Sequence, residues 1–262
     1  MSNVVCSENK YNRQDAMAKI KNKRWYQDSS QEIQEKIDEI PEDFQGFLND
    51  LADREEENGF YFIKKLKQIF WDDRYVVPTF EVKSKKDNSD YVNSFVAWRK
   101  GVHRSINSLV LVETQGEITH FIAKKSIRFA TGREIYESIG SIHPPRDVDE
   151  NSQEYMQYLQ QEFEKTLRLP NLKISRLINL GNIYPDAGMT DTIVKLIAIK
   201  VETCDINEIK NYIDGNIYND KRYDYGFEII PIERLLKFLS ETNDSFLLAI
   251  FGRLQALNVI KL

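Results

Sequence analysis

The sequence predicts an α+β protein in which a mixed β-sheet is packed on both faces and is preceded by a helical N-terminal region. Residues 15–70 are polar, almost free of Gly and Pro, and rich in helix formers. From Tyr75 onward, β-branched and alternating segments dominate, with helical patterns at about 151–169 and after residue 244. Strands and helices in this order are typical of a layered α+β domain. We therefore expect a helical region at 1–75 and a second domain at 76–262.

Three helices are predicted in the N-terminal region. Ile33, Ile37 and Ile40 recur at helical spacing in QEIQEKIDEI. Pro41 ends that helix and begins the next, PEDFQGFLNDLADREEE. A third helix is predicted at about 60–70 because its apolar residues also recur at helical spacing: Phe62, Ile63, Leu66, Ile69 and Phe70.

The second domain begins with strand patterns. YVVPTFEVK alternates, and SINSLVLVE and ITHFIAKK flank a short turn at 114–117, which predicts a hairpin. After the helix at about 151–169 come two further strand patterns, ISRLINLGNIY and IVKLIAIKV. The last helix is predicted to begin after a cap at Asp244 or Ser245.

Composition narrows the function classes. The 262 residues carry 36 Lys+Arg against 41 Asp+Glu, a net charge of −5, which does not favour non-specific nucleic-acid binding. No stretch approaches the ~20 apolar residues of a membrane-spanning helix. Two cysteines, Cys6 and Cys204, make no disulfide framework, and the first residues lack the apolar core of a signal peptide. These features predict a cytoplasmic protein.

Three segments resemble, in order, the Nudix hydrolases of the ADP-ribose pyrophosphatase branch. The first is FIAKKSIRFATGREIYESIGSI, with Arg128 and Glu137 at the family's positions. The second is NLGNIYPDAGMTDTIVKLIAIKV, which is similar to the family's Tyr-Pro-x-x-Gly loop and carries Tyr184 and Asp191. The third is the tail FEIIPIERLLKFLSETNDSFLLAIFGRL. The resemblance covers about residues 76–262 and implies a Nudix fold.

The family signature, G-x5-E-x7-R-E-U-x-E-E-x-G-U, is degenerate in this chain. In the family, glutamates one helical turn apart hold Mg²⁺ ions on a diphosphate. The best register retains Glu162 but places Lys165 and Thr166 at the paired glutamates. Lys165 lies one turn from Glu162, so its ammonium is expected to pair with Glu162 where the family keeps a divalent cation.

The resemblance assigns several candidate site residues. Glu162 and Glu154 are the candidates for catalytic carboxylates if the protein is active, and Glu137 and Glu162 are those for Mg²⁺. Arg128, Tyr184 and Asp191 are the candidates for binding substrate. For Glu162 the alternative interpretation, a carboxylate paired with Lys165, is favoured, because a lone carboxylate rarely holds Mg²⁺ against its hydration shell.

Three functions remain open at this stage. The preferred one is a Nudix-fold protein that binds a nucleotide-type ligand such as ADP-ribose, or serves in regulation or protein interaction, with little or no hydrolysis. The second is an active Mg²⁺-dependent pyrophosphohydrolase that uses displaced carboxylates. The third is an interaction protein whose partner docks on residues 1–75. The family also implies a homodimer.

Overall fold

The computed structural model describes residues 11–101, 104–128, 132–142, 152–167, 173–186, 189–190, 192–215 and 225–260. The chain divides into two compact units, one of Met1–His103 with Asp186–Ile193 and one of Arg104–Pro185 with Val194–Leu262. Within the described residues, no helix is both long and apolar enough to cross a membrane.

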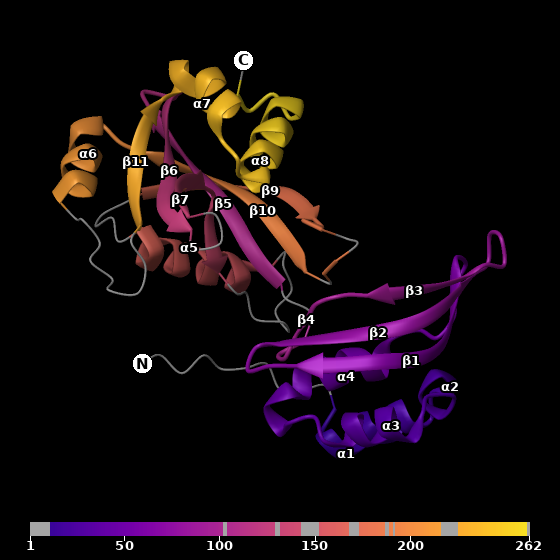
Figure 1. Cartoon of the computed structure of the whole chain (residues 1–262). Helices are drawn as coiled ribbons and strands as arrows, with labels where there is room; N and C mark the ends of the chain where they lie inside the picture. The colour runs from indigo at the N-terminus through magenta and orange to yellow at the C-terminus, as the bar shows by residue number, and fades with distance from the viewer. Residues whose placement is uncertain are drawn as a thin grey trace. The chain divides into compact units, whose positions relative to one another are not determined.

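The first unit is a layer of helices on one face of an antiparallel sheet (Figure 1). Its elements are α1 (Arg13–Lys21), α2 (Arg24–Gln27), α3 (Gln31–Asp38), η1 (Glu42–Phe44), α4 (Gln45–Asp53), β1 (Tyr61–Trp71), β2 (Tyr75–Ser84), β3 (Asp90–Ser94) and β4 (Ala97–Trp98). Helices α3 and α4 confirm two predicted helices. Their buried residues, including Ile33, Ile37 and Leu48, pack against sheet residues such as Leu66 and Phe80.

The predicted third helix at 60–70 is wrong, because these residues form strand β1, paired with β2. Register shifts lie between Ile63 and Lys65 and between Leu66 and Gln68. Each bulge adds a residue to the strand, so the buried positions are Ile63, Leu66 and Ile69, three residues apart. That spacing imitates a helix. Because β1 pairs with β2, the compact unit extends beyond the boundary expected at residue 75.

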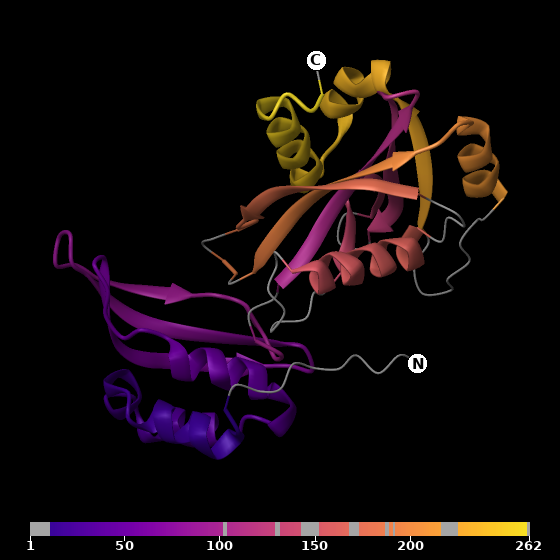
Figure 2. The ribbon, with the colours of Figure 1, turned by 180° about the vertical axis from the view of Figure 1, so that it is seen from behind.

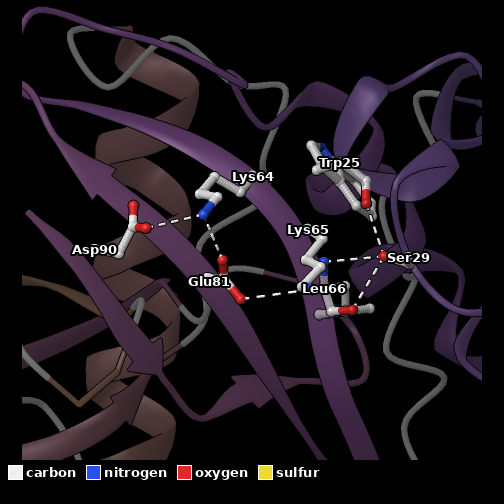
Figure 3. A network of polar contacts seen from close by, with 7 residues as sticks. All are labelled: Trp25, Ser29, Lys64, Lys65, Leu66, Glu81 and Asp90. Carbon is white, nitrogen blue, oxygen red and sulfur yellow. Dashed lines mark hydrogen bonds and ion pairs between the residues drawn. The ribbon is translucent and has the colours of Figure 1, made fainter.

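A buried hydroxyl contacts the backbone of β1 in the middle of its outer edge. Ser29 Oγ accepts from Leu66 N and donates to Leu66 O, both at 3.0 Å, and lies 2.7 Å from Trp25 O (Figure 3). Buried Ser29 thereby satisfies both backbone groups of Leu66, which an edge strand would otherwise leave unpaired.

The second unit is a seven-stranded sheet with helices on both faces, as predicted (Figure 2). Its elements are β5 (Arg104–Thr114), β6 (Glu117–Arg128), β7 (Arg133–Glu137), β8 (Ile139–Ile142), α5 (Gln153–Leu167), β9 (Lys173–Ile183), β10 (Ile193–Glu202), α6 (Ile206–Gly215), β11 (Tyr225–Pro231), η2 (Ile232–Arg234), α7 (Leu235–Glu241) and α8 (Ser245–Ala256). The strand order is β11-β6-β5-β10-β9, with β7 on β6 and β8 on β5.

Alternation along the central strands explains the two layers. On β5, Leu109 and Leu111 join the core beneath α7 and α8, whereas Val110 and Val112 join the core beneath α5 and α6. The predicted hairpin of β5 and β6 turns through Gln115 and Gly116, whose φ angles of 54° and 84° are those of a type I′ turn. The α+β class is thus confirmed.

Candidate functional site

Helix α5 is the element that carries the degenerate signature. Tyr155, Leu159 and Phe163 recur every four residues and are at most 1% exposed, so one face of the helix is fixed in the core. The other side chains of residues 153–166 are half-buried or exposed. The buried face of α5 is therefore closed to a ligand, and only side chains outside that face can contact one.

Glu162 and Lys165 form the expected ion pair. Lys165 Nζ lies 2.6 Å from Glu162 Oε1, one helical turn away. The Glu162 side chain is 29% exposed. Burial, and to a lesser extent the negative charge of Glu162, raises the pKa of the neighbouring Tyr158 hydroxyl. One oxygen of the surviving signature carboxylate is therefore occupied by an ammonium group.

Glu154 lies in the first turn of α5 and is exposed. It stands eight residues before Glu162, which at 1.5 Å per residue is roughly 12 Å along the helix. A Mg²⁺ ion binds its oxygen ligands at about 2.1 Å. Direct ligation of one ion by both Glu154 and Glu162 would therefore require both side chains to extend fully toward each other along the helix.

Glu137 is the most buried carboxylate of the site. It ends β7 opposite Lys124 of β6, and its side chain is 5% exposed. Lys124 Nζ lies 2.9 Å from Oε1, and Arg128 donates from Nε at 2.6 Å and from Nη2 at 2.5 Å to Oε2. Lys124 and Arg128 share a face of β6 with Ile122, which belongs to the core beneath α5.

The two basic groups decide the ionisation of Glu137. Burial alone would raise the pKa of its carboxyl, but the hydrogen bond and charge of Lys124, with Ser126 and Arg128, outweigh burial and hold that pKa below its usual value. Glu137 is consequently a carboxylate at neutral pH, already neutralised by its neighbours.

A second, half-buried carboxyl lies beside this cluster. Asp244 is the N-cap of α8, as the sequence predicted, and its Oδ1 accepts from Leu247 N at 2.8 Å. Its Oδ2 accepts from Ser138 N at 3.3 Å, which ties the end of β7 to α8. Burial, opposed by these backbone hydrogen bonds and reinforced by the charge of Glu137, raises the pKa of Asp244.

Two candidate substrate-binding residues, Tyr184 and Asp191, follow β9 in the sequence. Tyr184 follows β9 and is 60% exposed, so its ring is accessible to a ligand. Asp191 lies outside the described residues. Sequence reasoning missed Lys124 and the link from Asp244 to Ser138. The available signal was the alternation of β6, which puts Lys124 four residues before Arg128 on one face.

The carboxylates that the structure describes at this site do not fit Mg²⁺. A divalent ion prefers carboxylate oxygens that are free to ligate it. Glu137 already contacts an ammonium and a guanidinium, and Glu162 contacts an ammonium. The described part of the chain also holds no group of three or more His, Cys, Asp or Glu side chains placed to bind a metal.

Comparison with known proteins supports the fold. No protein-family model matches the chain. No curated protein matches it either. Among solved structures, it is similar to one described as "Crystal structure of ADP compounds hydrolase", with a TM-score of 0.51 and 8% identity over 79% of this chain and 100% of the other. The chain therefore has a Nudix-like α+β fold. At 8% identity the likeness concerns the fold alone.

Proposed function

We propose that this protein binds a nucleotide-type ligand of the ADP-ribose class and hydrolyses it slowly or not at all. The observation that carries the proposal is the ion pair of Lys165 with Glu162, at the position where the signature requires metal-binding glutamates. The pairing of Glu137 with Lys124 and Arg128 supports it, because it neutralises the second candidate metal ligand.

The same basic groups suit an anionic ligand. Arg128 is 53% exposed and Lys165 is 69% exposed, so both guanidinium and ammonium can reach a phosphate. A guanidinium binds phosphate through two parallel hydrogen bonds, which gives geometric specificity as well as energy. Binding of a diphosphate by these groups would need no metal ion.

Calorimetric titration of ADP-ribose into the full-length protein, once with Mg²⁺ and once with EDTA, tests the proposal. We expect saturable binding of similar affinity in both buffers and no AMP afterwards. Arg128→Ala should weaken binding about tenfold, the loss of roughly one charge-assisted contact. Lys125→Gln is the matched control, because Lys125 lies on the opposite face of β6 and pairs with Glu134.

Sustained turnover with Mg²⁺ that disappears in Glu162→Gln would instead establish the alternative, an active pyrophosphohydrolase with displaced carboxylates. If the titration produces no heat, the nucleotide-ligand hypothesis is rejected and the interaction-protein hypothesis is favoured. In that case the region at residues 1–75, whose helices α1 to α4 lie within residues 13–53, is the one whose partner should be sought.

A further inference from the structure

The sheet of the first unit has an open face opposite its helices. Directly paired residues share a face, so the pairs Phe62–Lys83, Lys65–Glu81 and Phe70–Val77 lie away from the helical core. Phe70 is 58% exposed, and Phe60, just before β1, is 82% exposed. We call this surface of β1, β2 and β3 the open face.

The two bulges of β1 enrich the open face in lysine. A regular strand would send every second residue to the core. Here each bulge sends two consecutive residues outward, first Lys64 and Lys65, then Lys67 and Gln68. Three lysines of one strand therefore reach the same face, which is a recognised effect of bulges on side-chain direction.

Charge is segregated between the two layers of this unit. Residues 61–94, which hold β1 to β3, carry seven basic and five acidic residues, whereas residues 11–60 carry seven basic and thirteen acidic ones. The net charge of −5 for the whole chain conceals this difference. The sheet is the basic layer, and six of its basic residues are lysines: Lys64, Lys65, Lys67, Lys83, Lys85 and Lys86.

Part of this charge is already paired. Lys64 Nζ lies 2.7 Å from Glu81 and 3.0 Å from Asp90, which links all three strands (Figure 3). Lys65 lies 3.7 Å from the same Glu81. Lys67 and Lys83 form no ion pair with any residue that the structure describes. The pairs fix the lysines on the face, and positive charge remains in excess.

We propose that the open face binds single-stranded nucleic acid. Exposed rings on a sheet, set among lysines, match the requirements of such a ligand, because bases stack on aromatic side chains and phosphates meet ammonium groups. Phe70 on β1 and Phe60 just before β1 are 58% and 82% exposed, so two rings ten residues apart along the chain are open to bases. An acidic protein partner could pair with the lysines, but its binding would not require exposed aromatic rings. The residues of this surface belong to the first unit, whereas those of the proposed nucleotide site belong to the second.

Fluorescence anisotropy of labelled oligonucleotides of about 12 nucleotides, dT and U homopolymers, tests the proposal with the full chain. We expect saturable binding at about 50 mM salt that weakens steeply by about 200 mM. Phe70→Ala should reduce affinity at least about fivefold through lost stacking. Lys67→Gln with Lys83→Gln should lower the slope of log affinity against log salt by about 1.4.

Matched controls come from other surfaces. Leu248→Ala removes a 45% exposed apolar side chain of α8, and Lys19→Gln with Lys36→Gln removes two lysines of the helical layer. Both should leave affinity within about twofold of wild type. No anisotropy change at 50 mM salt would overturn the proposal. So would equal effects of test and control variants at unchanged melting temperature, or equally tight binding of polyglutamate.

Discussion

Replacing Glu137 by Gln removes one negative charge from a buried cluster and keeps the shape of the side chain. Glu137 is 5% exposed and Lys124 is 18% exposed, so the ammonium of Lys124 would remain largely out of water without its carboxylate. Arg128, at 53% exposed, can turn to solvent. The cost of Glu137→Gln therefore comes mainly from Lys124.

The magnitude follows from this burial. Removing one partner of a buried ion pair costs about 3–5 kcal/mol. Because Lys124 keeps some contact with water, we expect the lower end, about 3 kcal/mol. For a unit of this size that corresponds to a fall of roughly 6–12 °C in melting temperature. Adding Lys124→Met to Glu137→Gln should recover part of the loss, since the half-buried ammonium that lost its carboxylate is then removed as well.

Urea unfolding followed by circular dichroism measures the effect, with Glu134→Gln as the control. Glu134 pairs with Lys125 at 2.9 Å, but its side chain is 55% exposed, so its loss should cost at most about 1 kcal/mol. If Glu137→Gln unfolds within 1 kcal/mol of wild type, the neutralised cluster does not exist as described.

A pH series adds an independent check. The pKa of Glu137 is lower in the folded state than the unfolded value of about 4.3, because Lys124 and the other neighbours outweigh burial. The carboxylate therefore stabilises the fold above pH 4.3, and this contribution is lost as pH falls through the folded pKa. The difference between wild type and Glu137→Gln should shrink over that interval. A constant difference would contradict the assigned ionisation.

Three further substitutions test other parts of the fold. Asp244→Asn keeps a helix cap but removes a carboxyl whose folded pKa is raised by burial, so the variant should gain stability relative to wild type as pH rises above about 3.9, measured by thermal melting. Arg253→Met removes hydrogen bonds of 2.5 and 2.9 Å to two carbonyls of β9 and should cost about 2–3 kcal/mol, with faster amide exchange in that strand. Gly46→Ala would put a methyl group 2.0 Å from the backbone of Lys100 and should cost at least about 3 kcal/mol in urea unfolding.

Elements with local signals were predicted correctly from the sequence. The β5–β6 hairpin needed only two apolar runs and a turn containing Gly116. Helix α8 was placed by its capping Asp244, and α5 by apolar residues four apart. In each case the information lies within a few residues of the element, so a single sequence suffices.

Strand β1 could not be predicted from its local sequence. Its buried residues Ile63, Leu66 and Ile69 have a period of three only because β2 imposes two bulges on the pairing. The bulges are a property of two strands together, and no pattern within β1 distinguishes them from a helical face. The same bulges create the lysine-rich surface, so the error of the sequence prediction and the new surface have one cause.

The contacts of the candidate site also differ in whether the local sequence could predict them. The pair of Glu162 and Lys165 was predicted because residues three apart on a helix are neighbours by construction. The pair of Lys124 and Glu137 joins two strands, and its detection requires the register of β6 with β7. Asp244 reaches Ser138 across more than a hundred residues of sequence, a contact that only packing determines.

Both candidate metal ligands are neutralised by different elements, one within α5 and one between β6 and β7. If only Lys165 occupied a ligand position, the change could be attributed to drift of one residue in an otherwise intact metal site. Lys124 and Arg128 act on Glu137 independently, through a register that involves no residue of α5. Each of the two carboxylates is thus balanced by cationic side chains of the chain itself, which is consistent with a site that meets an anionic ligand with its own side chains. An enzyme relying on Mg²⁺ would have to displace both, each against a carboxylate that the fold already satisfies.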